Sequence, residues 1–412
     1  MNSNLDNQIN KGKGFFTDEA KNMEILIHEI EDALGRNKNQ FPNFSIQDGW
    51  LGQALFYCYY ARFTDNDNWF GKVEDAMNKS LEVVDYAYYK RIYPTDSYDH
   101  NLASLGKFYS LCTQNGFLDM DYCSYLKPIS ETLIELCRNK IRHKDFSYFS
   151  GALAAGHYFL FQECNNEVSK TIIEEIVIGI KESAIADEKG GLYWKSPKLY
   201  NRVYLGLTHG SAMIVSFLAA VYEHGILKEV CAKLMHGALL HIISIKRDYG
   251  TRLFPYYIGE DSNKSQFSLC YGDLGVAFGI LRGGAILQDH EILKEGKLVM
   301  DACMKKKHED HQTFDASITY GAVGIAHVFE KLSRLFPEEK AYEQSYRYWI
   351  HQVPKYRTHN KENTAGFNSF ISNYSPHFDY SFSWGISGIG VSLMHYLRKD
   401  GIPSLDGFTC VI

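Results

Sequence analysis

The stretch "SLCYGDLGVAFGIL", residues 268–281, contains the pattern that decides the fold. Two glycines, Gly272 and Gly275, stand three positions apart and open a run that is almost wholly apolar. Positions i and i+3 lie on one face of a helix, and glycines there let neighbouring backbones approach closely. The stretch therefore predicts a buried helix that is packed tightly at its N-terminus.

The same pattern occurs seven times, at intervals of roughly 50 to 60 residues, which is typical of repeat architectures. In each copy a pair of residues spaced i, i+3, usually small, opens an apolar run. The copies are "DGWLGQALFYCYY" (Gly49, Gly52), "NLASLGKFYSLC" (Ala103, Gly106), "FSGALAAGHYFLF" (Gly151, Ala154), "THGSAMIVSFLAAVY" (Gly210, Met213), "CYGDLGVAFGIL" (Gly272, Gly275), "TYGAVGIAHVFEKL" (Gly321, Gly324) and "SWGISGIGVSLMHYL" (Gly385, Gly388).

Amphipathic segments separate these copies, and in them apolar residues recur with the 3.6-residue helical period. They include residues 18–34, 168–184, 227–246 and 289–306. Residues 212–222, in contrast, are apolar nearly all round, as in a helix buried on every face. An open solenoid does not need such inner helices. The alternation predicts an all-α fold, an α/α toroid of seven inner and seven outer helices, forming a single domain over residues 1–412 with about 14 flexible residues at the N-terminus.

The composition, 45% hydrophobic and 22% charged, is that of an ordinary folded protein. The net charge is −6 and basic residues are dispersed, so we expect no nucleic-acid partner. No signal-peptide core is visible, and no apolar run reaches the about 18 residues of a membrane span. Nine cysteines without a tight pairing pattern favour a reducing compartment over a disulfide framework. The sequence predicts a cytoplasmic protein.

Long segments lead into the last four inner helices, whereas the turns that follow the inner helices are short. These long segments are residues 188–209, 248–271, 309–320 and 354–384. Long loops concentrate where function lies. The N-termini of the inner helices lie at the same end, and their free N–H groups favour a thiolate, carboxylate or enolate. We call this end of the ring the mouth and expect one functional site there.

Four motifs stand at the mouth, each directly before an inner helix: "GLTHG" (206–210), "LCYG" (269–272), "ITYG" (318–321) and "FSWG" (382–385). His209 and Cys270 occupy nearly equivalent positions, one and two residues before the glycine. Together they suit part of a zinc site or a thiolate–imidazole pair. A buried core thiol is the third interpretation of Cys270.

With its seven glycine-opened helices, "THG" in the fourth copy and "CYG" in the fifth, the chain resembles the lanthionine cyclases, the LanC-like family, over roughly residues 15–400. The resemblance implies a toroid with zinc at its mouth. It also implies addition of a peptide cysteine thiol to dehydroalanine or dehydrobutyrine, which makes a thioether ring. Zinc would supply the thiolate, and it needs three protein ligands and one open position.

The family's first zinc cysteine matches Cys270, its neighbouring tyrosine matches Tyr271, and its histidine, a proposed proton carrier, matches His209. The family's other two zinc ligands stand at Thr319 and Tyr320, neither of which is a usual ligand. Cys270 is thus the only matching ligand, and we expect no zinc cofactor. Rescue ligands would have to come from "HEDH" (308–311), or from His377 and Asp379 near the seventh inner helix.

Two more family positions are replaced. The family's acid stands at Ser147, with Asp145 two residues upstream, and its arginine stands at Gln266. We therefore predict His209, Tyr271 and Cys270 as catalytic residues. The predicted peptide-binding residues of the mouth are Tyr320, Thr319, Trp384, Gln266 and Asp145.

These residues predict a cyclase of modified-peptide biosynthesis that works without the family's zinc site, on a precursor peptide and with a dehydratase partner. A non-catalytic module that holds the precursor peptide or a modifying enzyme is the alternative. The aromatic and basic loop 190–204 suits an extended peptide in either case. A glycoside hydrolase would need paired carboxylates, and the mouth motifs contain only Asp273.

Overall fold

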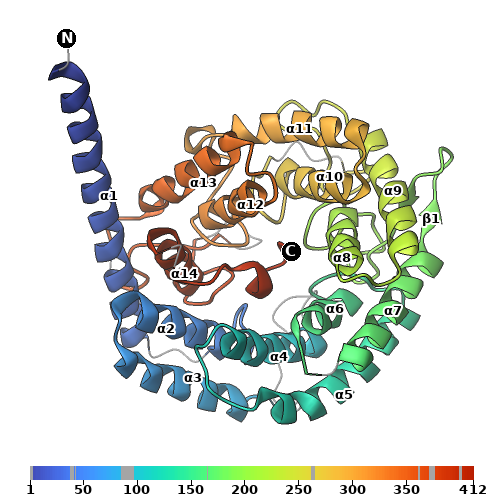
Figure 1. Cartoon of the computed structure of the whole chain (residues 1–412), viewed down its shortest axis with the longest axis horizontal. Coiled ribbons are helices and arrows are strands. Elements are labelled where there is room, and N and C mark those ends of the chain that lie inside the picture. The colour runs from blue at the N-terminus through green and yellow to red at the C-terminus, as the bar shows by residue number, and fades with distance from the viewer. Residues whose placement is uncertain are drawn as a thin grey trace.

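Two concentric rings of helices surround a common centre in the computed structural model (Figure 1). The outer ring consists of α1 (Ser3–Arg36), α3 (Phe70–Glu82), α5 (Tyr122–Arg142), α7 (Asn166–Ser183), α9 (Lys228–Ile245), α11 (His290–Met304) and α13 (Lys340–Gln352). The inner ring consists of α2 (Trp50–Thr64), α4 (Tyr98–Gln114), α6 (Ala152–Phe161), α8 (Ser211–Glu223), α10 (Asp273–Leu287), α12 (Ala322–Leu335) and α14 (Ile386–Leu397). In the part of the chain that the structure describes, the predicted toroid of seven inner and seven outer helices is confirmed.

The structure describes residues 3–37, 41, 43–84, 97–164, 166–260, 265–360, 362–370, 376–398 and 401–412, with side chains in the first helix from Asp18 onward. Helix α1 begins at Ser3, inside the segment expected to be flexible, and that expectation stays a prediction. Within the described ranges, no helix combines the length and hydropathy that a membrane span requires.

The two rings differ in burial as their sequences predict. In α8 every residue from Ser211 to Val221 is buried, whereas α7 buries one stripe that includes Ile172, Ile176 and Ile180. Contacts between distant parts of the chain close the ring. The Arg398 guanidinium lies 3.1 Å from the Asp65 carboxylate, although the two residues are 333 positions apart.

Small elements lie between the helices. A two-stranded antiparallel hairpin, β1 (Ile185–Ala186) and β2 (Leu192–Tyr193), follows α7. It pairs Ile185 with Tyr193 and Ala186 with Leu192. The described residues also form four short 3-10 helices: η1 (Asp67–Trp69), η2 (His308–Asp310), η3 (Val353–Tyr356) and η4 (Asp406–Phe408).

One predicted helix start is wrong. The small pair Ala103 and Gly106 lies inside α4, which begins at Tyr98. Ser97 caps this helix, because its hydroxyl accepts the N–H of His100 at 3.4 Å. An N-cap serine with an acidic residue in the first turn is a stronger start signal than a pair of small residues.

The loops before four inner helices share a turn that our repeat analysis missed. An Asp or Asn side chain accepts the N–H of the serine two positions later, and its backbone carbonyl accepts the first N–H of the helix. The sequence signal is Asp/Asn-x-Ser followed by glycine six positions after the acidic or amide residue. The four turns begin at Asn43, Asp145, Asp315 and Asp379.

The paired glycines make room for this turn. A Cβ atom on Gly321 would lie 2.3 Å from Oδ1 of Asp315. A Cβ atom on Gly324 would lie 1.7 Å from the carbonyl oxygen of Ile318, far inside van der Waals contact. Gly321 and Gly324 therefore pack against residues of their own loop, six positions upstream. The sequence predicts that such glycines pack against a neighbouring helix, and at these two positions they do not.

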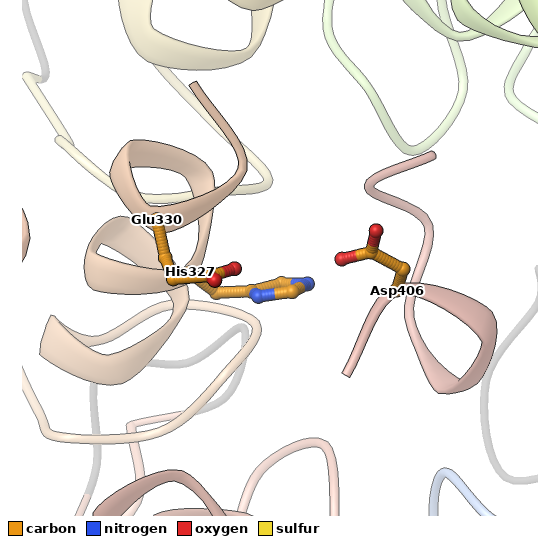
Figure 2. A group of neighbouring side chains, drawn as sticks. All are labelled: His327, Glu330 and Asp406. Atoms are coloured by element: carbon orange, nitrogen blue, oxygen red, sulfur yellow. The ribbon is translucent and has the colours of Figure 1, made fainter. Parts of the chain in front are cut away.

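Residues 401–412, the C-terminal segment, run into the centre of the ring (Figure 1). The Asp406 carboxylate accepts hydrogen bonds from Lys331 at 2.7 Å and Arg334 at 2.6 Å, and the Thr409 hydroxyl bonds Nε2 of His327 at 2.9 Å. Figure 2 shows Asp406 facing His327 of α12. The segment buries Phe408, Cys410, Val411 and Ile412, so side chains fill the centre.

The structure contains a disulfide bond that the sequence did not indicate. Cys123, at the start of α5, and Cys164, just after α6, form a disulfide bond across 41 residues. No short spacing motif marks a pair that encloses a whole helical hairpin, which is why the sequence did not reveal it. The other seven cysteines are free and buried.

Candidate functional site

Equivalent residues of different repeats form a chain of backbone hydrogen bonds around the mouth. The N–H of Cys270 donates to the carbonyl of Thr319 at 3.3 Å, the N–H of Thr319 donates to Ser383 at 3.0 Å, and the N–H of Ser383 donates to Gln47 at 2.8 Å. Each of these residues stands two positions before the glycine of its repeat. The repeat symmetry therefore brings four distant segments together at one opening.

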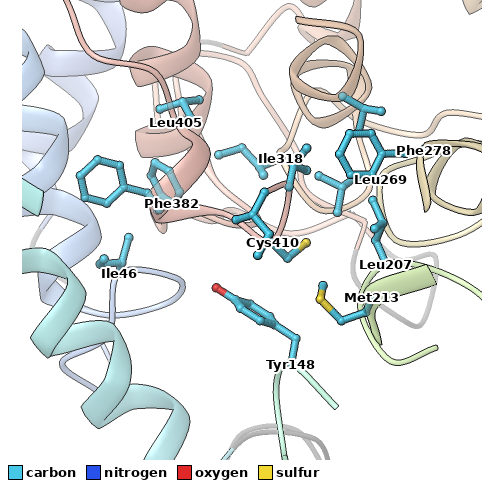
Figure 3. Packing of buried hydrophobic residues seen from close by; sticks show 14 of the residues in the cluster. Ile46, Tyr148, Leu207, Met213, Leu269, Phe278, Ile318, Phe382, Leu405 and Cys410 are labelled. Atoms are coloured by element: carbon cyan, nitrogen blue, oxygen red, sulfur yellow. The ribbon is translucent and has the colours of Figure 1, made fainter. Parts of the chain in front are cut away.

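A narrow central well lies inside this chain of hydrogen bonds. Figure 3 shows side chains from several repeats, among them Tyr148, Leu269 and Ile318, gathered around Cys410 of the C-terminal segment. The lining of the well is Gln47, Tyr148, Phe149, Thr208, Leu269, Ile318, Thr319, Phe382, Ser383, Phe408, Thr409 and Cys410. Because the C-terminal segment supplies the last three, it closes the well within the ring.

A second, small pocket, the side pocket, opens beside the well and shares Thr208 with it. Its lining is Tyr204, Gly206, Thr208, His209, Pro255, Tyr256, Cys270, Tyr271, Gly272 and Val276. All three predicted catalytic residues thus lie on the wall of one cavity, although they come from two repeats.

Ser147 orients His209 in this pocket. The Ser147 hydroxyl oxygen lies 3.0 Å from Nδ1 of His209 and already accepts the N–H groups of Phe149 at 3.2 Å and Ser150 at 3.4 Å. Since both lone pairs of that oxygen are used, its own proton is directed at Nδ1. Nδ1 is then the acceptor, and Nε2 of His209 carries the proton. Burial lowers the pKa of His209 to about 4, so the ring is neutral near pH 7.

Replacing Ser147 by aspartate is expected to reverse this arrangement. A carboxylate only accepts, so Nδ1 would hold the proton and Nε2 would become the basic nitrogen. The negative charge would also raise the pKa of His209 from about 4 by about one to three pH units. Nitrogen NMR of the imidazole measures both the tautomer and the titration. Ser147→Ala is the control and should leave the pKa low; equal titration of all three proteins would contradict the assigned contact.

Cys270 is a buried, neutral thiol. Its sulfur lies 3.1 Å from the hydroxyl oxygen of Thr208. Burial raises the pKa of the Cys270 thiol to about 12, and the hydrogen bond with Thr208 lowers it only in part. A thiolate, the form that attacks carbon or binds a metal, is therefore disfavoured here. The surroundings favour the core-thiol interpretation, and the catalytic role of Cys270 stays a prediction.

Aromatic rings extend from the side pocket across the mouth. The rings of Tyr271 and Tyr320 are parallel with centroids 6.0 Å apart, and the rings of Tyr256 and Tyr271 are 5.0 Å apart. The ring of Tyr204 lies 6.1 Å from that of His209. Such surfaces contact extended peptides through ring faces and edges.

The remaining predicted mouth residues do not line either cavity. Trp384 and Gln266 are buried, and the backbone N–H of Gln266 donates to the hydroxyl of Tyr256 at 2.5 Å. Asp145 is held in its turn by the hydroxyl of Ser150 at 3.1 Å. None of these three residues, nor Tyr320, is part of the lining of the well or the side pocket. Their role in peptide binding stays a prediction.

Asp273, the single carboxylate of the mouth motifs, holds a loop. Its two oxygens accept the N–H groups of Leu253 at 2.7 Å and Phe254 at 3.0 Å. Burial raises the pKa of Asp273 to about 6, against the effect of these two hydrogen bonds. Its carboxylate is therefore engaged in positioning the segment that precedes α10.

The residues around Cys270 do not fit a three-ligand zinc site. Threonine and tyrosine stand where the resemblance places two ligands, and the carbonyl of Thr319 already accepts the N–H of Cys270. Among the rescue candidates, the ring centroids of His308 and His311 lie 6.4 Å apart. Nε2 of His377 lies 3.7 Å from Oδ2 of Asp379. Within the described ranges, neither pair gathers with Cys270 into a group of three close ligands.

One such group does exist, and it consists of His327, Glu330 and Asp406 (Figure 2). Its carboxylates are already matched by cations, because Arg334 bonds both of them and Lys331 bonds Asp406. Burial raises the pKa of each carboxyl group, yet the neighbouring hydrogen bonds and positive charges outweigh it and hold the pKa of each at about 2. The group is a neutralised ion-pair network that ties the C-terminal segment to α12.

Sequence analysis missed Thr208, Ser383 and Gln47, although a signal was present. Each stands two residues before a repeat glycine, as Cys270 and Thr319 do. An alignment of the seven copies by that glycine would have pointed to these three residues and to Phe149 of the third copy, but not to the lining residues that the C-terminal segment supplies.

Three comparisons place the chain among known proteins. No curated protein matches it. Among solved structures, nisin cyclase matches with a TM-score of 0.70 and 16% sequence identity, covering 95% of this chain and 97% of that one. A possible member of the GH105 family from Salmonella enterica gives a TM-score of 0.43 and 14% identity, covering 92% and 95%.

The likeness to nisin cyclase shows that the two chains share a fold. The family is shown by a second comparison, in which the model of the lanthionine synthetase C-like proteins matches residues 40–406, most of the chain. This protein belongs to the lanthionine synthetase C-like family.

Proposed function

We propose that the protein forms thioether rings by adding a peptide cysteine thiol to dehydroalanine or dehydrobutyrine, without zinc at the family's position. Membership of the family supports the reaction class. The observation that carries the proposal is the contact between the Ser147 hydroxyl and Nδ1 of His209. This contact leaves the proton of His209 on Nε2, the ring nitrogen farther from Ser147, and His209 lines the side pocket.

In this reaction the thiolate sulfur of the peptide attacks the β-carbon of the dehydro residue. A carbon–sulfur bond forms, the π-electron pair moves onto the adjacent carbonyl oxygen, and an enolate results. His209 donates its Nε2 proton in a hydrogen bond to that oxygen, where the negative charge develops. The thiol releases its proton to solvent, and the α-carbon later takes one up. A few per cent of a free thiol is ionised near pH 7, so no metal is needed to supply the nucleophile.

Proximity supplies the rest of the acceleration, because it turns a bimolecular addition into an effectively unimolecular one. The aromatic rings of Tyr271 and Tyr256 at the side pocket are suited to hold the peptide while the thiol and the dehydro residue meet. A dehydratase is the class of partner that must act first, since it makes the dehydro residue from serine or threonine. We place the reaction in the cytoplasm, which the seven free thiols favour, although Cys123 and Cys164 form a disulfide bond.

Purified protein incubated with a dehydrated, cysteine-containing peptide tests the proposal. Ring formation consumes the free thiol without changing the mass, so alkylation of residual thiols measures the rate, and a reaction without protein gives the background. Elemental analysis of the same protein tests the zinc statement. Stoichiometric zinc that disappears in the Cys270→Ala variant would overturn it.

A peptide-holding module is the second candidate, and the threonine and tyrosine at positions 319 and 320 favour it. Such a module would bind the dehydrated peptide and leave its rate of ring closure at the background value. Binding measured together with the rate separates the two candidates.

A further inference from the structure

A hairpin beside the side pocket presents an exposed aromatic ring in a strained conformation. This mouth hairpin comprises residues 194–204, and its two arms pair through an isolated antiparallel bridge between Ser196 and Arg202. At its tip, Tyr200 and Asn201 both have left-handed backbone conformations, with φ of 57° and 58°. A bulky side chain rarely adopts this conformation, and strain of this kind gathers at functional positions. Tyr200 is 82% exposed, so burial of its ring contributes little stabilisation to offset the strain.

The base of the mouth hairpin is fixed to the rest of the site. The indole N–H of Trp194 donates to the carbonyl of Ile180 at 2.8 Å, and the hydroxyl of Ser196 donates to the carbonyl of His209 at 3.0 Å. The last residue, Tyr204, lines the side pocket. A ligand bound along the hairpin therefore continues directly into the pocket.

The hairpin also carries positive charge. Lys195, Lys198 and Arg202 are all exposed, and no described residue forms an ion pair with any of the three. The guanidinium of Arg202 lies over the rings of Tyr257, at 4.3 Å, and Tyr200, at 5.3 Å. The whole chain has a net charge of −6, so this cluster is a local exception.

We propose that the mouth hairpin binds an acidic, aromatic-containing segment of the peptide substrate and so delivers the reacting residues to the side pocket. Carboxylates of the segment pair with the three cations, and its aromatic side chains stack on Tyr200 and on the guanidinium of Arg202. The hairpin is pre-organised, which lowers the cost of ordering on binding. The statement that this peptide is the substrate rests on the proposed function. The binding of an acidic, aromatic-containing peptide by the mouth hairpin does not.

A fluorescein-labelled synthetic peptide rich in Asp, Glu and Tyr, without cysteine, tests this proposal by fluorescence anisotropy. The triple variant Lys195→Glu, Lys198→Glu, Arg202→Glu should bind it more weakly by about tenfold or more, and added salt should weaken binding to the unmodified protein. The matched control is Lys127→Glu, Lys170→Glu, Lys233→Glu on the outer helices, which changes the net charge equally and should retain the affinity.

A second variant separates recognition from folding. Tyr200→Gly removes the ring and also relieves the left-handed backbone, so its melting temperature should not fall while its affinity for the peptide does. Three outcomes would overturn the proposal: equal affinity for a peptide with Asn and Gln in place of its acids, equal losses in the two triple variants, or tighter binding of a single-stranded oligonucleotide. Because no ring is formed in this assay, these outcomes are independent of whether the protein is a cyclase.

Discussion

Thioether ring formation is expected to slow by about 10²-fold to 10³-fold when His209 is replaced by alanine, because one hydrogen-bond donor to the developing enolate is lost. Ser147 leaves the proton of His209 on Nε2, and burial keeps the ring neutral, so the unmodified protein has this donor at any pH well above 4. The rate should therefore rise with pH as the substrate thiol ionises, near a pKa of about 8.5. His209 itself should add no titration step between pH 6 and 9.

The His209→Gln variant distinguishes a donor from a base. A glutamine side chain offers an N–H close to the position of Nε2 but takes up no proton, so it should restore a large part of the rate if His209 donates. Equal inactivity of the glutamine and alanine variants would instead indicate a general base. His236→Ala, an exposed histidine of α9, is the control and should react as the unmodified protein does. Identical rates for all four proteins would end the catalytic interpretation and favour the peptide-holding module.

The largest expected effect on stability belongs to Gly324→Ala. Its added methyl group would lie 1.7 Å from the carbonyl oxygen of Ile318, and neither atom can rotate away because both belong to or adjoin the backbone. The loop before α12 would have to move, and with it Thr319 of the central well. We expect the free energy of unfolding to fall by about 3 kcal/mol or more. Chemical denaturation measures this change.

Gly71→Ala is the matched control, since a Cβ atom there meets no atom within 4 Å. Gly71 lies in the first turn of α3, where alanine is the better helix former, so this variant should be as stable as the unmodified protein or more stable by up to about 1 kcal/mol. Equal stability of the Gly324 and Gly71 variants would contradict the packing described for the turn.

The double ring was predictable because its cause is a repeated local pattern. Small residues three apart followed by an all-round apolar run specify a tightly packed inner helix, and the amphipathic segments specify its outer partner. The convergence of His209 and Cys270 on one cavity followed from the same symmetry, since equivalent positions of a closed repeat must meet at one end.

Other features depend on contacts that periodicity does not encode. The ion pairs of Asp406 with Lys331 and Arg334, which hold the C-terminal segment in the ring, join residues about 70 positions apart and have no spacing signature. The tautomer of His209 depends on the hydrogen bonds that the Ser147 hydroxyl accepts from the N–H groups of Phe149 and Ser150. A sequence shows the serine but not these partners. The turn before four of the inner helices has a sequence motif, Asp/Asn-x-Ser followed by glycine. Only the glycine of that motif is part of the repeat pattern predicted from the sequence.

Closure of the ring has a consequence for how the chain is made. The α14 helix packs against α1 and α2, and the ion pair between Arg357 and Glu29 spans 328 positions. While the ribosome is still adding the last repeats, the side of α2 that packs against α14 has no partner, and neither has the open side of the newest inner helix. Contacts so distant in sequence form slowly, and exposed apolar surface promotes aggregation in the meantime. The nascent chain is therefore expected to depend on chaperones until its final helix emerges.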